Sequence, residues 1–122
     1  MTLTDRCPVS ATLELIGGKY KALILWLLSE GSLRFSELKK HIHSATPKML
    51  TQQLRELESH KLIHREVYPV IPPKVEYSLT EEGKSLLPIL VAMRDWGANY
   101  LRGKDLESKC FMMGSDPVAT SN

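Results

Sequence analysis

The sequence predicts a mainly α-helical (α+β) domain that contains a single β-hairpin. Helical patterns occupy the first half of the chain, two short alternating segments follow, and one more helical pattern comes after them. The chain has 122 residues, of which 43% are hydrophobic, so it can form one compact domain with a core. This order of helices, hairpin and helix is that of a winged helix-turn-helix with a two-stranded β-wing.

The first two helices are predicted from their boundary residues. Pro8 begins a short helix that runs to Ile16, because a proline at the first helical position has no N–H to satisfy. Gly17 and Gly18 end this helix, and we expect a left-handed cap there. A second helix over residues 19–29 is apolar on nearly every side, so it must be covered from several directions.

Two further helices, over residues 37–42 and 47–59, are predicted with a short turn between them. Ser36 is the expected N-cap of the former, and Thr46 that of the latter. Apolar residues recur along residues 47–59 at helical spacing and form one stripe. They are Met49, Leu50, Leu54 and Leu57. Two helices joined by so short a turn form a helix-turn-helix.

The two alternating segments cover residues 63–68 and 74–79, and the five residues between them include three prolines. Because proline cannot donate to a β ladder, we expect a hairpin with a stiff loop. Thr80 then caps a long last helix that continues to about Leu101. Pro88 lies inside this helix and is expected to bend it.

Cysteine usage and hydropathy favour a cytoplasmic protein. Cys7 and Cys110 are too few and too far apart for the disulfide framework of a small secreted fold. No signal peptide is recognised, and the longest apolar run is shorter than the roughly 20 residues that cross a bilayer, so no membrane partner is expected. We predict one domain over residues 7–103, with a flexible segment over residues 1–6 and a polar, poorly ordered tail over residues 104–122.

The outward face of the helix over residues 47–59 carries hydroxyl, amide and cationic side chains, the groups that contact base edges and phosphates of DNA. These residues are Thr46, Lys48, Thr51, Gln52 and Arg55. Arg34, Ser44 and Lys74 are further candidate DNA contacts, with Lys74 at the loop end of the hairpin. For Lys74 alone, a solvated turn lysine is an equally good interpretation.

Charge distribution agrees with a double-stranded DNA partner. Residues 34–74 contain eight lysines and arginines and four glutamates, a net charge of +4, whereas the whole chain carries only +2. A lone amphipathic helix with such a face would be read as an ordinary solvated surface. The helix-turn-helix and the wing together favour DNA instead.

Other functions fit the sequence less well. The sequence does not indicate an enzyme, because it has neither paired carboxylates nor a Ser/His/Asp arrangement in a recognisable context. The histidines lack the cysteine partners and the spacing of a zinc site, so no metal and no other cofactor is expected. These histidines are His41, His43, His60 and His64. A winged helix used only for protein contacts would carry an apolar or acidic face on residues 47–59.

Several short motifs, in order and at matching spacing from Cys7 to about Leu101, resemble the HxlR-type regulators. These are bacterial winged-helix proteins related in architecture to the MarR-type regulators. The matching residues are Cys-Pro at 7–8, Leu-Ile-Gly-Gly-Lys at 15–19, Arg-Phe-Ser-Glu-Leu at 34–38, Lys-Met-Leu-Thr at 48–51, Leu-Arg-Glu-Leu-Glu at 54–58, Pro-Pro-Lys-Val-Glu-Tyr-Ser-Leu-Thr at 72–80, Gly83, Leu86 and Trp-Gly at 96–97.

The sequence departs from the usual pattern of these regulators at three places. His60-Lys61 stands where a glycine usually precedes the residue matching Leu62, Tyr20 replaces a tryptophan, and the turn over residues 43–45 lacks a glycine. If Lys61 adopts a left-handed conformation, it costs about 1 kcal/mol relative to glycine. None of these changes removes a predicted DNA contact.

The resemblance implies a homodimer on a pseudo-palindromic operator, with residues 47–59 as the reading helix and the N- and C-terminal helices as the dimer interface. We expect a repressor, with an activator as the alternative. Two apolar stripes on the last helix agree with this, because one can cover the domain and leave the other for a partner. The predicted interface residues are Leu13, Leu86, Leu90, Met93, Trp96 and Tyr100.

The resemblance also implies a signal, since several such regulators sense electrophiles or oxidants through a cysteine that matches Cys7. A helix start favours the reactive thiolate, so a small electrophile or oxidant is a candidate inducer. Cys110 is a candidate resolving cysteine that would clamp the dimer through a disulfide. An unreactive, packed Cys7 and an idle Cys110 are the alternatives, and a small ligand or a metal could replace thiol chemistry as the signal.

Overall fold

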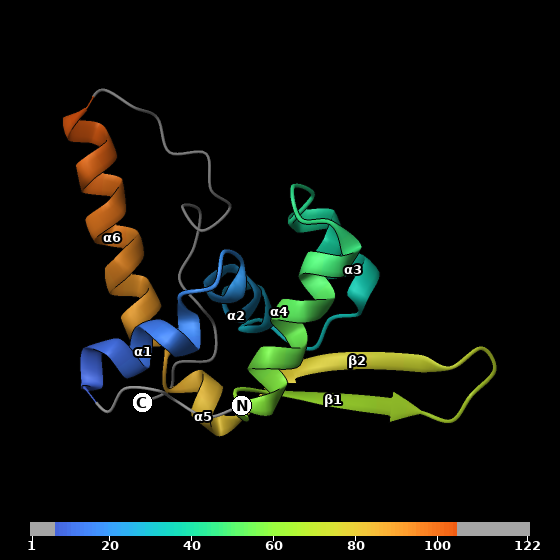
Figure 1. Ribbon diagram of the computed structural model, residues 1–122. Coiled ribbons are helices and arrows are strands. Elements are labelled where there is room, and N and C mark those ends of the chain that lie inside the picture. The colour runs from blue at the N-terminus through green and yellow to red at the C-terminus, as the bar shows by residue number, and fades with distance from the viewer. Residues whose placement is uncertain (1–6, 105–122) are drawn as a thin grey trace.

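The computed structural model describes residues 7–104 and confirms the winged helix-turn-helix architecture (Figure 1). The helices that precede the hairpin are α1 (Pro8–Ile16), α2 (Lys21–Leu28), α3 (Phe35–His41) and α4 (Pro47–Ser59). The hairpin consists of β1 (Ile63–Tyr68) and β2 (Lys74–Leu79), and it is followed by α5 (Glu81–Lys84) and α6 (Leu87–Gly103).

Helix α2 lies at the centre of the core and is covered from several directions, as its composition predicts. Its Ile24 and Leu25 are completely buried. The helix contacts α1, α4, α6 and β2. Helix α4 contributes its predicted apolar stripe to the same core, with Leu50, Leu54 and Leu57 buried and Met49 packed at the edge. Each such leucine contributes roughly 1.5–3 kcal/mol through removal of its side chain from water.

The wing is an antiparallel hairpin in which Ile63 lies opposite Leu79 and Tyr68 opposite Lys74. Leu33 joins the ladder from the loop between α2 and α3. Its backbone N–H donates to the carbonyl oxygen of Tyr77 at 3.0 Å, and the N–H of Tyr77 donates back at 2.8 Å. Figure 1 shows the hairpin projecting from the body on the side away from α6.

The predicted long last helix is in fact two helices. Helix α5 ends at Lys84 and α6 begins at Leu87, so Pro88 lies in the first turn of α6, where its missing N–H costs nothing. The expectation that Pro88 bends a continuous helix is therefore wrong. The short α5 approaches the chain before β1 closely, because a Cβ on Gly83 would lie 2.1 Å from the carbonyl oxygen of Leu62.

Three local expectations at helix ends are also corrected. Gly17 has a φ of −83°, so the expected left-handed cap is absent there. Helix α2 begins at Lys21 rather than at residue 19, because the preceding residues form a turn closed by the Lys21 N–H on the Gly18 carbonyl. Helix α3 begins at Phe35, and Ser36 lies inside it rather than at its cap.

Lys61 adopts the left-handed conformation that its position suggested, with a φ of 61°. It joins the end of α4 to the start of the wing, and its backbone N–H donates to the carbonyl oxygen of Glu58 at 2.9 Å. Such a conformation is unfavourable for a residue with a Cβ, by about 1 kcal/mol relative to glycine.

Candidate nucleic-acid interface

Helix α4 begins where its sequence predicts. The Thr46 side-chain oxygen accepts a hydrogen bond from the Met49 N–H at 3.1 Å, and Pro47 occupies the first helical position. The N-cap satisfies one of the N–H groups that have no partner within the helix, and the proline leaves none to satisfy at its own position. The turn from α3 therefore leads directly into a regular helix of 13 residues.

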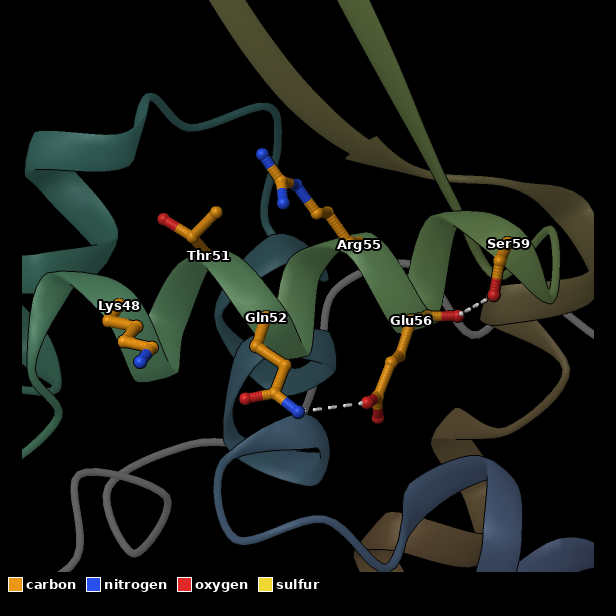
Figure 2. Close-up of a pocket in the computed structure, with 6 residues that line it drawn as sticks. All are labelled: Lys48, Thr51, Gln52, Arg55, Glu56 and Ser59. Atoms are coloured by element: carbon orange, nitrogen blue, oxygen red, sulfur yellow. Dashed lines mark hydrogen bonds between the residues drawn. The ribbon is translucent and has the colours of Figure 1, made fainter. Parts of the chain in front are cut away.

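The structure places the predicted polar residues together on the exposed side of α4. Thr46, Lys48, Gln52 and Arg55 are exposed and Thr51 is half-buried. A hollow of about 480 Å³ follows this side and is lined by Lys48, Thr51, Gln52, Arg55, Glu56 and Ser59. Figure 2 shows Thr51 and Arg55 projecting from one edge of the helix and Gln52 and Glu56 from the other.

The three other candidate DNA contacts lie on elements around α4. Arg34 is the exposed N-cap residue of α3, and its backbone N–H donates to Glu37 Oε1 at 2.8 Å. Ser44 lies exposed in the turn between the two helices, and its hydroxyl donates to the Tyr20 hydroxyl at 3.4 Å. Lys74 lies on the wing, with its Nζ 3.4 Å from Glu76 Oε2 and 5.0 Å from the Tyr68 ring centroid.

A buried ion pair fastens α4 to α2, and sequence reasoning missed it. Lys21 is 3% exposed, and its Nζ lies 2.7 Å from Glu56 Oε1. The same ammonium donates to the backbone oxygen of Glu14 in α1 at 3.4 Å. Its hydrogen bond holds the pKa of the Glu56 carboxyl below its ordinary value, although burial acts in the opposite direction.

A second contact that was not predicted joins α4 to the chain before α2. The Gln53 side-chain oxygen accepts a hydrogen bond from the Tyr20 backbone N–H at 3.2 Å. The one available sequence signal for these contacts was a lysine inside an otherwise apolar helix, because a buried cation requires a carboxylate partner. Nothing in the sequence indicates that the partner is Glu56 rather than Glu58.

A different exposed surface occurs on α1 and α6. It consists of large apolar side chains, which we call the apolar face: Val9, Leu13, Ile89, Met93, Trp96 and Tyr100. Trp96 is 68% exposed, and its ring stacks on that of Tyr100 with centroids 5.3 Å apart. Leu86 and Leu90 were also assigned to the dimer interface, and this is corrected. Both are buried in the core of their own chain.

Cys7 is the N-cap residue of α1 and is exposed. Hydrogen bonding to the backbone of Ser10 and Val9 lowers the pKa of the thiol, because it stabilises the thiolate. Cys110, residues 1–6 and the tail beyond residue 104 lie outside the described residues, so their predicted roles stay predictions.

Two negative findings apply to residues 7–104. In this part of the chain no group of three or more His, Cys, Asp or Glu side chains is arranged to hold a metal ion. None of the helices in the same range is both long enough and apolar enough to span a membrane.

Comparison with known proteins gives a consistent result. The family model described as HxlR-like helix-turn-helix matches residues 15–105. The helix-turn-helix-type transcriptional regulator YdeP of Bacillus subtilis strain 168 is 54% identical over 96 residues, which cover 79% of this chain and 75% of YdeP. A helix-turn-helix-type regulator of Methanothermobacter thermautotrophicus is 55% identical over 94 residues, covering 77% of this chain and 72% of that protein.

A solved structure extends the comparison to three dimensions. The redox regulator HypR in its oxidized form is 50% identical and superposes with a TM-score of 0.73. The match covers 76% of this chain and 96% of the HypR chain.

Proposed function

Because the chain belongs to the HxlR-like helix-turn-helix family of DNA-binding transcriptional regulators, we propose that it is a repressor that binds a pseudo-palindromic operator as a homodimer. The observation that carries this proposal is the exposed side of α4. Lys48, Gln52 and Arg55 lie there exposed to solvent, while the opposite side of the helix is buried.

The apolar face supports the homodimer. Met93, Trp96 and Tyr100 are each about half exposed or more, so they form a large exposed apolar area. A second copy of the chain would cover this area around a two-fold axis, as in most homodimers. Two copies of α4 would then meet two operator half-sites at a fixed spacing, which is why the operator is expected to be pseudo-palindromic.

Thiol modification at Cys7 is the proposed signal. Its exposure and lowered pKa favour the thiolate, and the similar protein HypR is a redox regulator. A quinone would bond to the Cys7 sulfur and take the thiolate electron pair and then a proton. A two-electron oxidant would instead join Cys7 to a second thiol, with Cys110 the candidate, as two protons and two electrons leave the pair.

The DNA proposal is tested by fluorescence anisotropy of the full chain on its own upstream DNA and on an unrelated duplex of equal length. We expect tighter binding to the upstream DNA, and weaker binding to both as salt rises over about 50–200 mM, because phosphate contacts release counterions. Gln52→Ala should reduce the discrimination between the duplexes roughly tenfold through loss of a bidentate base contact. Arg102→Gln on α6 is the control, and equal wild-type affinity for both duplexes would contradict operator recognition.

The signal is tested by treating the same protein with diamide or a quinone before binding is measured. We expect the wild type to lose operator binding and Cys7→Ser to retain it. Cys110→Ser distinguishes a disulfide from a modification of Cys7 alone, because only the disulfide needs both thiols. Retained binding by the treated wild type would contradict the proposed thiol signal and would point to a small ligand or a metal.

A further inference from the structure

A polar pocket lies between α4 and the wing. It has a volume of about 380 Å³, and the residues that line it are Thr51, Arg55, Glu58, Arg65 and Tyr77. The first three belong to α4, Arg65 belongs to β1 and Tyr77 to β2. The pocket is thus assembled by three elements at the base of the wing, next to the side of α4 that is proposed to meet DNA.

Arg65 reaches this pocket because of strand alternation. It lies directly opposite Tyr77 in the hairpin register and two residues after Ile63, which is buried in the core. Residues two apart on a strand point to the same face, so Arg65 shares the core-facing side of the hairpin with these two residues. Its neighbours His64 and Glu66 face the other way, where their side chains pair with each other at 2.7 Å.

The two cationic groups of the pocket lack an anionic partner. Within residues 7–104, neither the Arg55 nor the Arg65 guanidinium forms an ion pair or a side-chain hydrogen bond. Like charges that face one pocket repel each other unless an anion lies between them. The planar guanidinium fork matches phosphate oxygens, and the hydroxyl groups of Thr51 and Tyr77 are of the type that also contacts phosphate.

We propose that this pocket binds one phosphate group of the DNA backbone, held between Arg55 of α4 and Arg65 of β1. The proposal rests on the DNA-binding function and adds a contact that positions α4 against the duplex. It assigns Arg55, so far a candidate for base or phosphate contact, to phosphate binding. Gln52 projects from the other edge of α4, where its amide nitrogen donates to Glu56 Oε2 at 3.5 Å (Figure 2). Base reading is assigned to Gln52, because its exposed side chain can exchange this hydrogen bond for one to a base edge.

Glu58 is the acidic member of the pocket lining, so its removal is expected to change DNA affinity in the opposite direction to the removal of Arg65. Its carboxylate repels a phosphate and so weakens DNA binding. Glu58→Gln should therefore increase DNA affinity, by about threefold for a partly solvated charge, whereas loss of the Arg65 charge should decrease it. Opposite effects from two residues of one pocket are not expected from a general loss of fold.

The test measures anisotropy of the full chain on its upstream DNA and on the unrelated duplex over a range of salt. We expect Arg65→Gln to weaken binding to both duplexes by the same factor, roughly tenfold. The slope of log affinity against log salt should fall by about 0.9, the value for one phosphate contact. Arg65→Lys should keep the wild-type slope but lose part of the affinity, because an ammonium cannot form two parallel bonds.

Duplexes in which single phosphates are replaced by neutral methylphosphonates locate the contact. One replacement should weaken the wild type and have no effect on Arg65→Gln, since that variant has already lost the partner. Titration of inorganic phosphate alone into the protein separates a DNA contact from a site for a free anion. Phosphate binding that Arg65→Gln abolishes, together with an unchanged DNA salt slope, would overturn the proposal.

The matched control is Arg102→Gln, which removes one positive charge from α6 away from the pocket. If Arg65→Gln binds both duplexes as tightly as this control and with the same salt slope, the phosphate pocket is wrong, although operator recognition stands if Gln52→Ala still lowers discrimination. Equal wild-type affinity for both duplexes would contradict operator recognition only, because the Arg65→Gln slope decides the pocket on either duplex.

Discussion

Helices α4 and α6 bury leucines on one side in the same way, but their exposed sides differ in chemistry. The buried leucines are Leu50, Leu54 and Leu57 in α4, and Leu87 and Leu90 in α6. The exposed side chains are Lys48, Gln52 and Arg55 in α4, and Met93, Trp96 and Tyr100 in α6. Each helix therefore stabilises the same core while presenting a different surface.

This difference indicates two classes of partner. Cations and amides on the protein surface are well hydrated, so their exposure costs little free energy in the isolated protein. Phosphates and base edges replace this water when DNA binds. For exposed aromatic rings, in contrast, contact with another apolar surface lowers the free energy because it removes the rings from water. The exposed sides of the two helices thus support the two proposed partners, DNA for α4 and a second copy of the chain for α6.

The largest effect is expected from a charge on the apolar face of α6. Trp96→Glu should convert the proposed dimer to a monomer, because a carboxylate loses its hydration when two such faces meet. Operator affinity should fall at least about 100-fold, since each monomer then binds a half-site alone. Light scattering after size exclusion gives the mass, and anisotropy gives the affinity.

A matched control places the same charge elsewhere on α6. Arg102→Glu lies about 120° around the helix from Trp96 and should leave both mass and affinity close to those of the wild type. A Trp96→Glu protein that keeps the mass of a dimer would show that the two helices do not differ in the way we infer.

An intermediate effect is expected at the contact that holds α4 on the core. Lys21→Met leaves the Glu56 carboxylate without its partner, and the free energy of unfolding should fall by about 2 kcal/mol. We expect less than for a fully buried pair, because the Glu56 side chain is 25% exposed. Urea unfolding measures the change, and adding Glu56→Gln to Lys21→Met should restore part of it.

The pH dependence of stability tests the same ion pair between Lys21 and Glu56. Lys21 keeps the pKa of the Glu56 carboxyl below the ordinary 4.5. The pair therefore stabilises the fold fully above that pH, and this contribution is lost as the pH falls through the lowered pKa. The stability of Glu56→Gln should therefore decrease less than that of the wild type between neutral pH and about pH 3. An equal decrease in both proteins would argue against the ion pair.

The smallest effect has the opposite sign and concerns the end of α4. Lys61→Gly should increase the free energy of unfolding by about 1 kcal/mol, because glycine adopts a φ of 61° without strain. Lys61→Ala should give no such increase, since alanine keeps the Cβ. Equal effects of the two substitutions in urea unfolding would show that the backbone conformation is not the cause.

Local signals were sufficient to predict α4 and the wing. The Thr46 cap and Pro47 act within one turn, so the start of α4 is confirmed to the residue. Both strands also have their predicted bounds, because alternation and prolines act over a few residues. The last helix was predicted less well, since a proline in a helical pattern fits a bend and a new first turn equally well. The structure has a new first turn at Pro88, after α5 has packed closely against Leu62.

Local sequence signals specify the order of the elements and the polar side of α4, because caps, prolines and periodicity act between near neighbours in the chain. Tertiary structure alone decided that Lys21 pairs with Glu56 and that Leu90 is covered by its own core. It also decided that Arg65 and Arg55 line one pocket at the base of the wing. These outcomes depend on which elements pack together, and that is set by burial of the whole core rather than by any local pattern.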